Sequence, residues 1–297
     1  MNTVLSITPN NPAKLNNLQS DLRVFAAHGV SGKCIIAALP CKEEDGSIVN
    51  QPVGANLIEN QLDVAMEDPQ LRIWKVGELS SIYSIGEVAA AIRKYEISSV
   101  IFNPILNNAG AESYPDELID SLVIDLLPLT RLVVLTKKIA RELVGNDNKS
   151  AGARALAQEL HEIGANSVFV VDIPDEDSFE YVDVFLNGGG ITEIRSPVIA
   201  HNVTDGLDST LSASIAAYLA KGMRLEQAVQ HGREYLTAVL ASSGMDLQHL
   251  EKFGLSHLLG KVAIETSDQT KKSLSDTSSE IATLSKYMDM IEDSDFE

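Results

Sequence analysis

The sequence is organised around one stretch, Asn202-Val203-Thr204-Asp205-Gly206-Leu207-Asp208-Ser209-Thr210-Leu211-Ser212-Ala213. This stretch is a polar turn with a glycine, and it leads directly into an apolar helical segment at residues 211–220. Oxygen atoms of Asp208, Ser209 and Thr210 suit the first turn of a helix, because they accept hydrogen bonds from its free N–H groups. The same N–H groups, with the positive end of the helix dipole, form an anion site. The stretch therefore predicts either a phosphoryl-transfer site or an ordinary capped helix that binds nothing.

The composition limits the classes of protein to which this chain can belong. Its 297 residues are 44% hydrophobic and 22% charged, which is typical of a soluble globular protein with one large α/β domain or two small ones. A net charge of −19 argues against nucleic-acid binding, because a phosphate backbone would be repelled. Two cysteines, Cys34 and Cys41, do not support a disulfide framework or a zinc site.

The location expected from these features is the cytoplasm. Residues 1–7 lack the basic and apolar regions of a signal peptide. No segment reaches the roughly 18 apolar residues that a membrane-spanning helix needs, so no membrane partner is expected.

Strands and helices alternate along the first 170 residues. The predicted strands are 4–8, 33–39, 73–76, 99–102, 131–135 and 167–171, and the predicted helices are 16–28, 54–66, 85–95, 115–127, 137–144 and 151–163. This alternation predicts a parallel sheet with helices on both faces. The unbroken apolarity of 33–39 indicates a strand buried on both sides, and 43–52 is expected to be a polar loop.

The pattern changes after residue 170. Residues 181–186 and 191–195 flank the turn Asn187-Gly188-Gly189-Gly190 and predict a β-hairpin. Helices are expected at 208–221 and 225–240. We expect one domain at residues 1–262, followed by a polar, acidic and mobile tail at 263–297 with a short helix at 280–290. A docking or regulatory role of that tail is the alternative.

Four segments carry a resemblance to a known family. They are Leu18-Gln19-Ser20-Asp21-Leu22-Arg23, Lys75-Val76-Gly77-Glu78-Leu79, Asn103-Pro104-Ile105-Leu106 and Thr204-Asp205-Gly206-Leu207-Asp208-Ser209-Thr210-Leu211-Ser212-Ala213. In that order they resemble Gln-Ala-Asp-Leu-Lys, Lys-x-Gly-Met-Leu, Asp-Pro-Val-Met and Thr-His-Gly-Thr-Gly-Cys-Thr-Leu-Ser-Ala. These are motifs of the hydroxymethylpyrimidine/phosphomethylpyrimidine kinases of thiamine biosynthesis, in the ribokinase superfamily. The resemblance covers about residues 4–240.

The resemblance implies a fold and a reaction. The fold is a ribokinase-like three-layer α/β/α sandwich, with a mostly parallel sheet and a β-hairpin near residues 180–195. The reaction is ATP-dependent phosphoryl transfer to a pyrimidine alcohol or its monophosphate, with ATP and Mg²⁺ as cofactors and a homodimer as the assembly. Such an enzyme must take a proton from the hydroxyl and stabilise charge on the moving phosphoryl group.

Residue roles follow from the same resemblance. It implies that substrate is bound by Asp21, Lys42 and Glu78. It implies that nucleotide or phosphate is bound by Thr204, Gly206, Leu207, Thr210 and Lys138. The catalytic candidates are Asp208 and Ser209, and the resemblance assigns no residue of this chain as a metal ligand.

Several positions depart from the family's motifs. The family's first glycine-rich loop, Asp-Pro-Ser-Gly-Gly-Ala-Gly, is replaced by Asn11-Pro12-Ala13-Lys14-Leu15-Asn16-Asn17. Lys42 stands where the family has a Glu or Gln acceptor, and a lysine cannot accept a hydrogen bond. Lys138 and Arg141 stand where the family has an Asn and a Glu that serve metal and phosphates, and a lysine cannot support Mg²⁺. Two readings stay open: an active kinase with a divergent site, or a catalytically impaired kinase-fold protein that binds a ligand or regulates a partner.

The catalytic turn can be aligned with the family in two ways. Without a gap, Ser209 takes the place of the family's reactive Cys, and Asp208 replaces a glycine. With one residue deleted, Gly206-Leu207-Asp208 is a shortened Gly-x-Gly-Asp motif with Asp208 as the base, which favours a pyridoxal or sugar kinase. The ungapped alignment is preferred, because the match downstream needs no shift.

Overall fold

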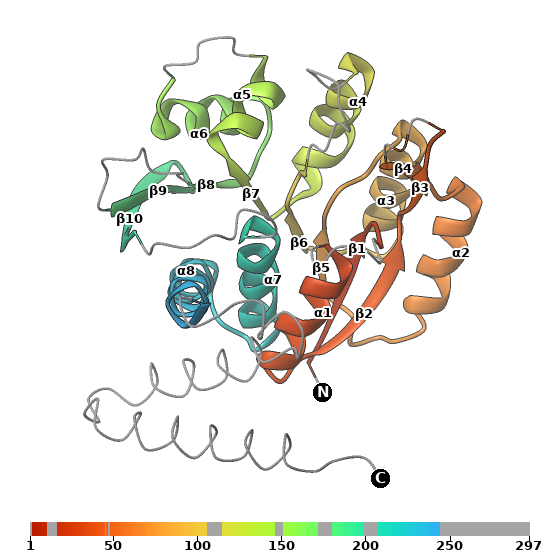
Figure 1. The fold of residues 1–297 in the computed structure, drawn as a ribbon, viewed down its shortest axis with the longest axis horizontal. Helices are drawn as coiled ribbons and strands as arrows, with labels where there is room; N and C mark the ends of the chain where they lie inside the picture. The colour runs from red at the N-terminus through yellow and green to blue at the C-terminus, as the bar shows by residue number, and fades with distance from the viewer. Residues whose placement is uncertain are drawn as a thin grey trace.

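A central β-sheet forms the middle of the molecule (Figure 1). The computed structural model describes residues 2–10, 17–44, 46, 48–105, 115–145, 151–171, 180–198 and 207–243. Within these residues the strands of the sheet are β1 (Thr3–Thr8), β2 (Ser31–Ile36), β5 (Ile73–Val76), β6 (Ser99–Phe102), β7 (Leu132–Thr136), β8 (Ser167–Val171), β9 (Glu180–Asn187) and β10 (Gly190–Pro197). Their order across the sheet is β10-β9-β8-β7-β6-β5-β1-β2. A separate antiparallel pair consists of β3 (Ala38–Lys42) and β4 (Ile48–Pro52).

The strand directions confirm a mostly parallel sheet with a terminal hairpin. Strands β2, β1, β5, β6, β7 and β8 are parallel to their neighbours in that series. Strand β9 is antiparallel to both β8 and β10. The turn between β9 and β10 has Gly188 at φ 56° and Gly189 at φ 80°, values that favour glycine.

Helices cover both faces of the sheet and give three layers. One face carries α1 (Leu18–Ala27), α7 (Leu207–Ala220) and α8 (Leu225–Ser243). The other carries α2 (Ala55–Ala65), α3 (Ile82–Lys94), α4 (Asp116–Ser121), the π-helical turn η1 (Leu122–Leu126), the 3₁₀ turn η2 (Leu127–Leu129), α5 (Lys137–Val144) and α6 (Ala153–Glu162). The three-layer α/β/α sandwich is therefore confirmed.

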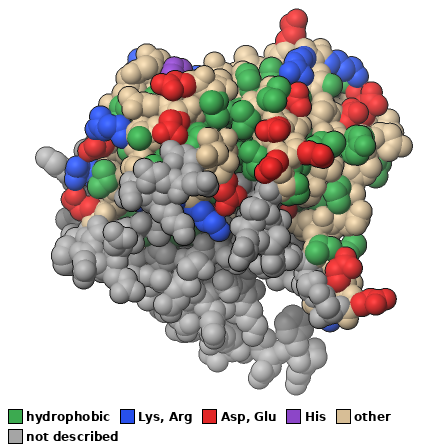
Figure 2. All heavy atoms as spheres, turned by 90° about the horizontal axis from the view of Figure 1, so that it is seen from above, with side chains coloured by type: hydrophobic (Ala, Val, Ile, Leu, Met, Phe, Trp, Pro, Cys, Tyr) green, Lys and Arg blue, Asp and Glu red, His purple; other side chains and the backbone are tan. Residues whose placement is uncertain are grey.

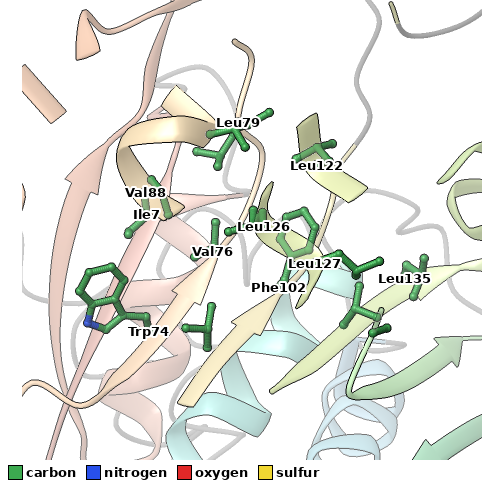
Figure 3. Packing of buried hydrophobic residues seen from close by; sticks show 14 of the residues in the cluster. Ile7, Trp74, Val76, Leu79, Val88, Phe102, Leu122, Leu126, Leu127 and Leu135 are labelled. Carbon is green, nitrogen blue, oxygen red and sulfur yellow. The ribbon is translucent and has the colours of Figure 1, made fainter. Parts of the chain in front are cut away.

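Two hydrophobic cores separate these layers, because successive side chains of a strand alternate between faces. On β1, Val4 packs with α1 and α7, whereas Leu5 packs with the helices of the opposite face. Figure 3 shows part of the core on the face covered by α2 to α6, where Phe102 of β6 lies beside Leu126 of η1.

Among the helices of the described residues, α7 is the most deeply buried, with ten of its fourteen residues buried. It lies against β1, β5, β6 and β7, in keeping with its apolar sequence. Gly232 of α8 lets the two helices approach closely, because a Cβ there would fall 2.6 Å from Cγ1 of Ile215. This packing fixes where the first turn of α7 meets the sheet.

Two sequence-based predictions of local structure are wrong. The strand predicted at 33–39 is divided between β2 and β3, and β2 is an edge strand with Cys34 exposed. Burial on both sides fails because, at the edge of the sheet, Gly32 and Cys34 are exposed and Ile35 is the one fully buried residue of β2. The polar loop predicted at 43–52 contains β4, since residues 48–52 pair with β3.

The remaining features of the surface bear on partners. No helix in the described ranges is both long and apolar enough to cross a bilayer. Acidic side chains are scattered over the surface shown in Figure 2, as the net charge of −19 requires. The predicted tail, residues 263–297, lies outside the described residues and stays a prediction.

Candidate active site

A ring of three buried polar side chains joins α1, β5 and α7 at the carboxyl end of the sheet. The Nζ atom of Lys75 lies 3.0 Å from Oδ2 of Asp21 and donates to Oγ of Ser209 at 3.1 Å. The Ser209 hydroxyl donates to Oδ1 of Asp21 at 3.0 Å. Ser6 of β1 adds a hydrogen bond to Oδ2 of Asp21 at 2.6 Å. The first turn of α7 is thereby fixed against two other elements.

The electrostatics of this ring depend on its complete burial. The side chains of Lys75 and Asp21 are both 0% exposed. Burial raises the pKa of the Asp21 carboxyl above its ordinary value, and the charge of Lys75 with the hydroxyls of Ser6 and Ser209 opposes that shift. Asp21 accepts from three donors, Lys75, Ser6 and Ser209. An ionised carboxyl group, which can only accept hydrogen bonds, suits such a set of partners. Removing either charge would leave the other without compensation in a dry environment.

Asp208 lies beside this ring but in a different environment. Its carboxylate is partly exposed at the start of α7. Oδ1 of Asp208 accepts from the backbone N–H of Ser209 at 2.9 Å, and Oδ2 lies 3.5 Å from Nδ2 of Asn103. Asn103 follows β6, and its Nδ2 also donates to the carbonyl of Val134 in β7 at 3.0 Å. Asp208 therefore sits at the carboxyl edge of the central strands.

Unpaired polar atoms gather at the same edge. Among the described residues, the buried atoms Thr8 Oγ1, Asn17 Oδ1, Glu78 Oε2 and Asn103 Oδ1 have no hydrogen-bond partner. Thr8 ends β1, Glu78 follows β5 and Asn103 follows β6, which are adjacent strands. Open α/β sheets bind ligands at the carboxyl ends of their strands, so this edge is the candidate active site.

Backbone hydrogen bonds hold the carboxyl ends of β1, β5 and β6 side by side. The N–H of Gly77 donates to the carbonyl of Ile7 at 2.8 Å, and the N–H of Asn103 donates to the carbonyl of Val76 at 2.8 Å. A Cβ on Gly77 would fall 2.5 Å from Oγ1 of Thr8. Glycine is needed here because the end of β5 passes so close to the end of β1.

Glu78 connects this edge to the β3–β4 pair. Its Oε1 accepts from Nδ2 of Asn50 in β4 at 2.7 Å and from Oγ of Ser80 at 3.3 Å. Burial raises the pKa of the Glu78 carboxyl, and the two hydrogen bonds oppose that shift. The β3–β4 pair is therefore tied to the site by a side-chain hydrogen bond.

Comparison with known proteins places the chain in a family. A model of the phosphomethylpyrimidine kinase family matches residues 17–253. The chain belongs to the phosphomethylpyrimidine kinase family. It is 27% identical over 243 residues to the hydroxymethylpyrimidine/phosphomethylpyrimidine kinase of Rhizobium meliloti (strain 1021), covering 80% of this chain and 90% of that protein.

Two further matches set the extent of the likeness. The thiamine biosynthesis bifunctional protein ThiED of Geobacter sulfurreducens is 27% identical over 80% of this chain. The matched region covers about half (49%) of the length of that relative. The pyridoxal kinase of Bacillus subtilis, solved as an ADP complex, superimposes with a TM-score of 0.74 at 23% identity, over 81% of this chain and 92% of that one. At that identity the superposition shows the fold alone.

The structure brings together some of the site residues that the resemblance to the family implies for this chain. Asp21, Asp208 and Ser209 meet at the carboxyl edge, and Thr210 joins them through a 3.2 Å contact between its Oγ1 and Oγ of Ser20. Leu207 is the first residue of α7. Two predicted phosphate-binding residues, Thr204 and Gly206, lie outside the described residues.

The two predicted lysines lie on the surface. Lys42 is exposed at the end of β3, and Lys138 is exposed in the first turn of α5. Helix α5 is capped by Thr136, whose Oγ1 accepts from the N–H of Ile139 at 3.4 Å. Lys138 thus stands beside a helix N-terminus at the carboxyl end of β7, a place where phosphate is favoured.

Lys75, Asn103 and Asn50 take part in the site although the sequence analysis assigned them no role. A signal existed for Lys75, because a lysine within the apolar strand 73–76 requires a buried partner. No comparable signal existed for Asn50, which belongs to a segment predicted as a loop.

Oxygen donors at the site suit Mg²⁺ in type. In the described part of the chain, no cluster of three or more His, Cys, Asp and Glu side chains is placed to hold a metal ion. The Asp208 carboxylate and the unpaired Oδ1 of Asn103 are nonetheless oxygen ligands of the kind that Mg²⁺ takes alongside nucleotide phosphates.

A hollow of about 650 Å³ lies at the opposite edge of the sheet, lined by Thr130, Ser167, Asn187 and Glu226 among others. Its polar side chains pair with one another: Ser167 donates to Asn187 at 2.9 Å, and Asn187 donates to Glu226 at 2.6 Å. Because its lining contains none of the predicted site residues, we assign the active site to the carboxyl edge.

Proposed function

We propose that this protein transfers a phosphoryl group from ATP to the hydroxyl group of a pyrimidine alcohol or its monophosphate, with Asp208 as the base. The observation that carries the proposal is the contrast between two neighbours at the start of α7. Asp208 is partly exposed, whereas Ser209 is 0% exposed and held by Lys75 and Asp21.

The hydrogen bonds of Ser209 argue against a reactive role. Its hydroxyl proton is directed to Asp21, and its oxygen already accepts from Lys75. A group that takes a proton from a substrate must reach that proton at hydrogen-bonding distance. Asp208 has the carboxylate and the exposure for this task, which favours the shortened Gly-x-Gly-Asp alignment over the ungapped one. The family match over residues 17–253 supports a pyrimidine alcohol as the substrate even with Asp208 as the base.

The first turn of α7 supplies the electrostatic part of the reaction. Free N–H groups and the helix dipole stabilise the negative charge that develops on a moving phosphoryl group. Lys138, exposed at the start of α5, would contact nucleotide phosphate, with Thr204, Gly206, Leu207 and Thr210 around the turn. Mg²⁺ would neutralise phosphate charge when bound with ATP, with the unpaired Oδ1 of Asn103 as an oxygen ligand.

Substitution of the two neighbours tests the assignment. Asp208→Asn removes the base but keeps the size of the side chain, so we expect kcat for ADP formation with hydroxymethylpyrimidine to fall by roughly 10²–10⁴. Ser209→Ala leaves the 3.0 Å pair of Lys75 and Asp21 intact, so we expect kcat to stay within about a factor of ten. A large loss in Ser209→Ala with full activity in Asp208→Asn would reverse the assignment.

A second candidate is a kinase-fold protein that binds nucleotide or pyrimidine without turnover. It is favoured by the exposed lysines at positions 42 and 138, where the family has hydrogen-bond acceptors. Under that function, ATP or hydroxymethylpyrimidine would raise the melting temperature, but no ADP would form. A homodimer and a cytoplasmic location stay predictions from the resemblance and the composition.

A further inference from the structure

The hollow of about 650 Å³ at the amino ends of β6, β7 and β8 has a lining that the proposed reaction does not use. Several of its polar side chains bond to other parts of the protein. Nδ2 of Asn166 donates to the carbonyl of Thr130 at 2.7 Å. Ser167 donates to Asn187, and Asn187 donates to Glu226. These groups hold the wall of the hollow together.

Two arginines in the same lining lack a carboxylate partner among the described residues. The guanidinium group of Arg131, just before β7, donates to Oγ of Ser99 at 2.8 Å and forms no ion pair there. Arg224, exposed just before α8, has neither a hydrogen bond nor an ion pair from its side chain to a described residue. In a chain with a net charge of −19, this hollow gathers two uncompensated positive charges.

The start of α8 adds hydrogen-bond donors to this positive region. The carbonyl of Arg224 accepts from the N–H of Ala228 at 2.9 Å, so the N–H groups of residues 225–227 precede the hydrogen-bond ladder of the helix. The 19-residue helix also directs the positive end of its dipole there. Glu226 places one negative charge in this turn, and its Oε1 accepts from Nδ2 of Asn187 at 2.6 Å. The two arginines therefore leave the hollow with a net positive charge.

We propose that this hollow binds a small molecule through a phosphate group, with Arg131 and Arg224 as the cationic partners. A guanidinium group matches phosphate oxygens with two parallel N–H donors, and the N-terminus of a helix favours phosphate. The volume lies within the roughly 300–1,000 Å³ of small-molecule sites. Leu129 and Leu225 supply an apolar wall for the rest of the ligand.

This second site is independent of the proposed reaction. The candidate active site lies at the carboxyl ends of β1, β5 and β6, whereas the hollow lies at the amino ends of the strands. Binding in the hollow therefore stands or falls whether or not ADP forms at the other edge.

A titration of the ¹⁵N-labelled full chain with pyrophosphate, without Mg²⁺, tests the inference by ¹H–¹⁵N TROSY NMR. We expect saturable changes in the amide resonances of Arg131, Gly188 and residues 224–227. Changes confined to the starts of α5 and α7 would overturn the inference, because they would place the anion only at the carboxyl edge.

Charge removal at the hollow sharpens the test. The double variant Arg131→Gln/Arg224→Gln should weaken pyrophosphate binding at these resonances by roughly tenfold or more, because two charge-assisted hydrogen-bonding groups are lost. The matched control is Arg154→Gln/Arg195→Gln, which changes the net charge equally but removes surface arginines that pair with Glu193. The control should keep the wild-type affinity within about twofold.

Arg224→Gln alone guards against a loss of folding, since the Arg224 side chain bonds to no described residue. It should weaken binding by roughly threefold or more. Wild-type affinity in both the single and the double variant would contradict the proposal.

Citrate separates phosphate from carboxylate as the preferred group. The tetrahedral oxygens of a phosphate can accept from both guanidinium groups and from the N–H groups of α8 at once, so we expect citrate to bind more weakly than pyrophosphate. Citrate binding that is as tight as pyrophosphate binding would overturn the assignment to phosphate.

Discussion

Asp208 and Ser209 are adjacent in sequence, but the fold gives them different tasks. Ser209 closes a buried ring with Lys75 and Asp21, and Asp208 remains partly exposed next to Asn103. The sequence identified both residues but could not separate them, because burial depends on segments more than 130 positions apart, as in the Lys75–Ser209 hydrogen bond (|i−j| = 134).

Loss of the Lys75 charge should destabilise the fold strongly. Lys75→Met leaves the Asp21 carboxylate buried without its partner, and we expect a loss of about 3–5 kcal/mol in the free energy of unfolding. Urea denaturation followed by circular dichroism measures it. Lys94→Met is the control, because the Lys94–Asp63 pair is on the surface and contributes little.

Addition of Asp21→Asn to Lys75→Met removes the stranded charge and should recover part of the loss. If Lys75→Met is no more destabilising than Lys94→Met, the buried ring does not hold the start of α7.

His28 should make the protein sensitive to mild acid. Its ring is 4% exposed, with Nδ1 2.8 Å from the carbonyl of Val24 and Nε2 3.0 Å from the hydroxyl of Ser214. Burial, with a smaller contribution from the charge of Lys221, lowers the pKa of His28 from 6.5 to about 4, and the hydrogen bond that the ring donates to the carbonyl of Val24 opposes that shift. Protonation therefore favours the unfolded chain, so this stability is present above pH 6.5 and is lost as the pH falls towards 4.

The expected loss from His28 across that window is roughly 3 kcal/mol. His28→Gln should flatten the dependence of the urea midpoint on pH between 6.5 and 4, and the exposed His161→Gln should not. An identical pH profile in His28→Gln and the wild type would show that His28 does not cause the acid sensitivity.

Among the elements, those bounded by strong local signals were predicted best. Strand β8 and helix α5 have the predicted bounds, 167–171 and 137–144. Each is recognised from local sequence alone, β8 from its short apolar segment and α5 from its cap and its amphipathic pattern. Strand β4 was missed because it exists only by pairing with β3. The exposure of β2 was missed because the order of strands in a sheet is a tertiary property.

Two helix glycines should respond to alanine in opposite directions. Gly232→Ala in α8 forces a methyl group to within 2.6 Å of Ile215 in α7, and we expect a loss of roughly 1–3 kcal/mol from overpacking. Gly86→Ala in α3 meets no atom within 4 Å, so the better helix propensity of alanine should add about 0.5–1 kcal/mol. Thermal denaturation of both variants measures the difference, and a shift of the same sign in both would contradict the close α7–α8 contact.

For the whole molecule, the site is a product of topology. Parallel strands deliver the ends of β1, β5 and β6 to one edge, and α7 starts there after more than 200 residues of chain. The resemblance to the kinase family anticipated Asp21 and the start of α7 at this edge. It could not supply Asn50, nor the hydrogen bonds that join Lys75 to Asp21 and Ser209, because those contacts form only when distant segments pack together.

The measurement that tests phosphoryl transfer at the α7 edge most directly is a ³¹P NMR time course of the full chain with ATP, Mg²⁺ and hydroxymethylpyrimidine. We expect a new phosphomonoester resonance to grow as ADP forms, and we expect it to be absent with Asp208→Asn. An unchanged ATP spectrum with the wild-type protein, or the same product formed by Asp208→Asn, would contradict the account.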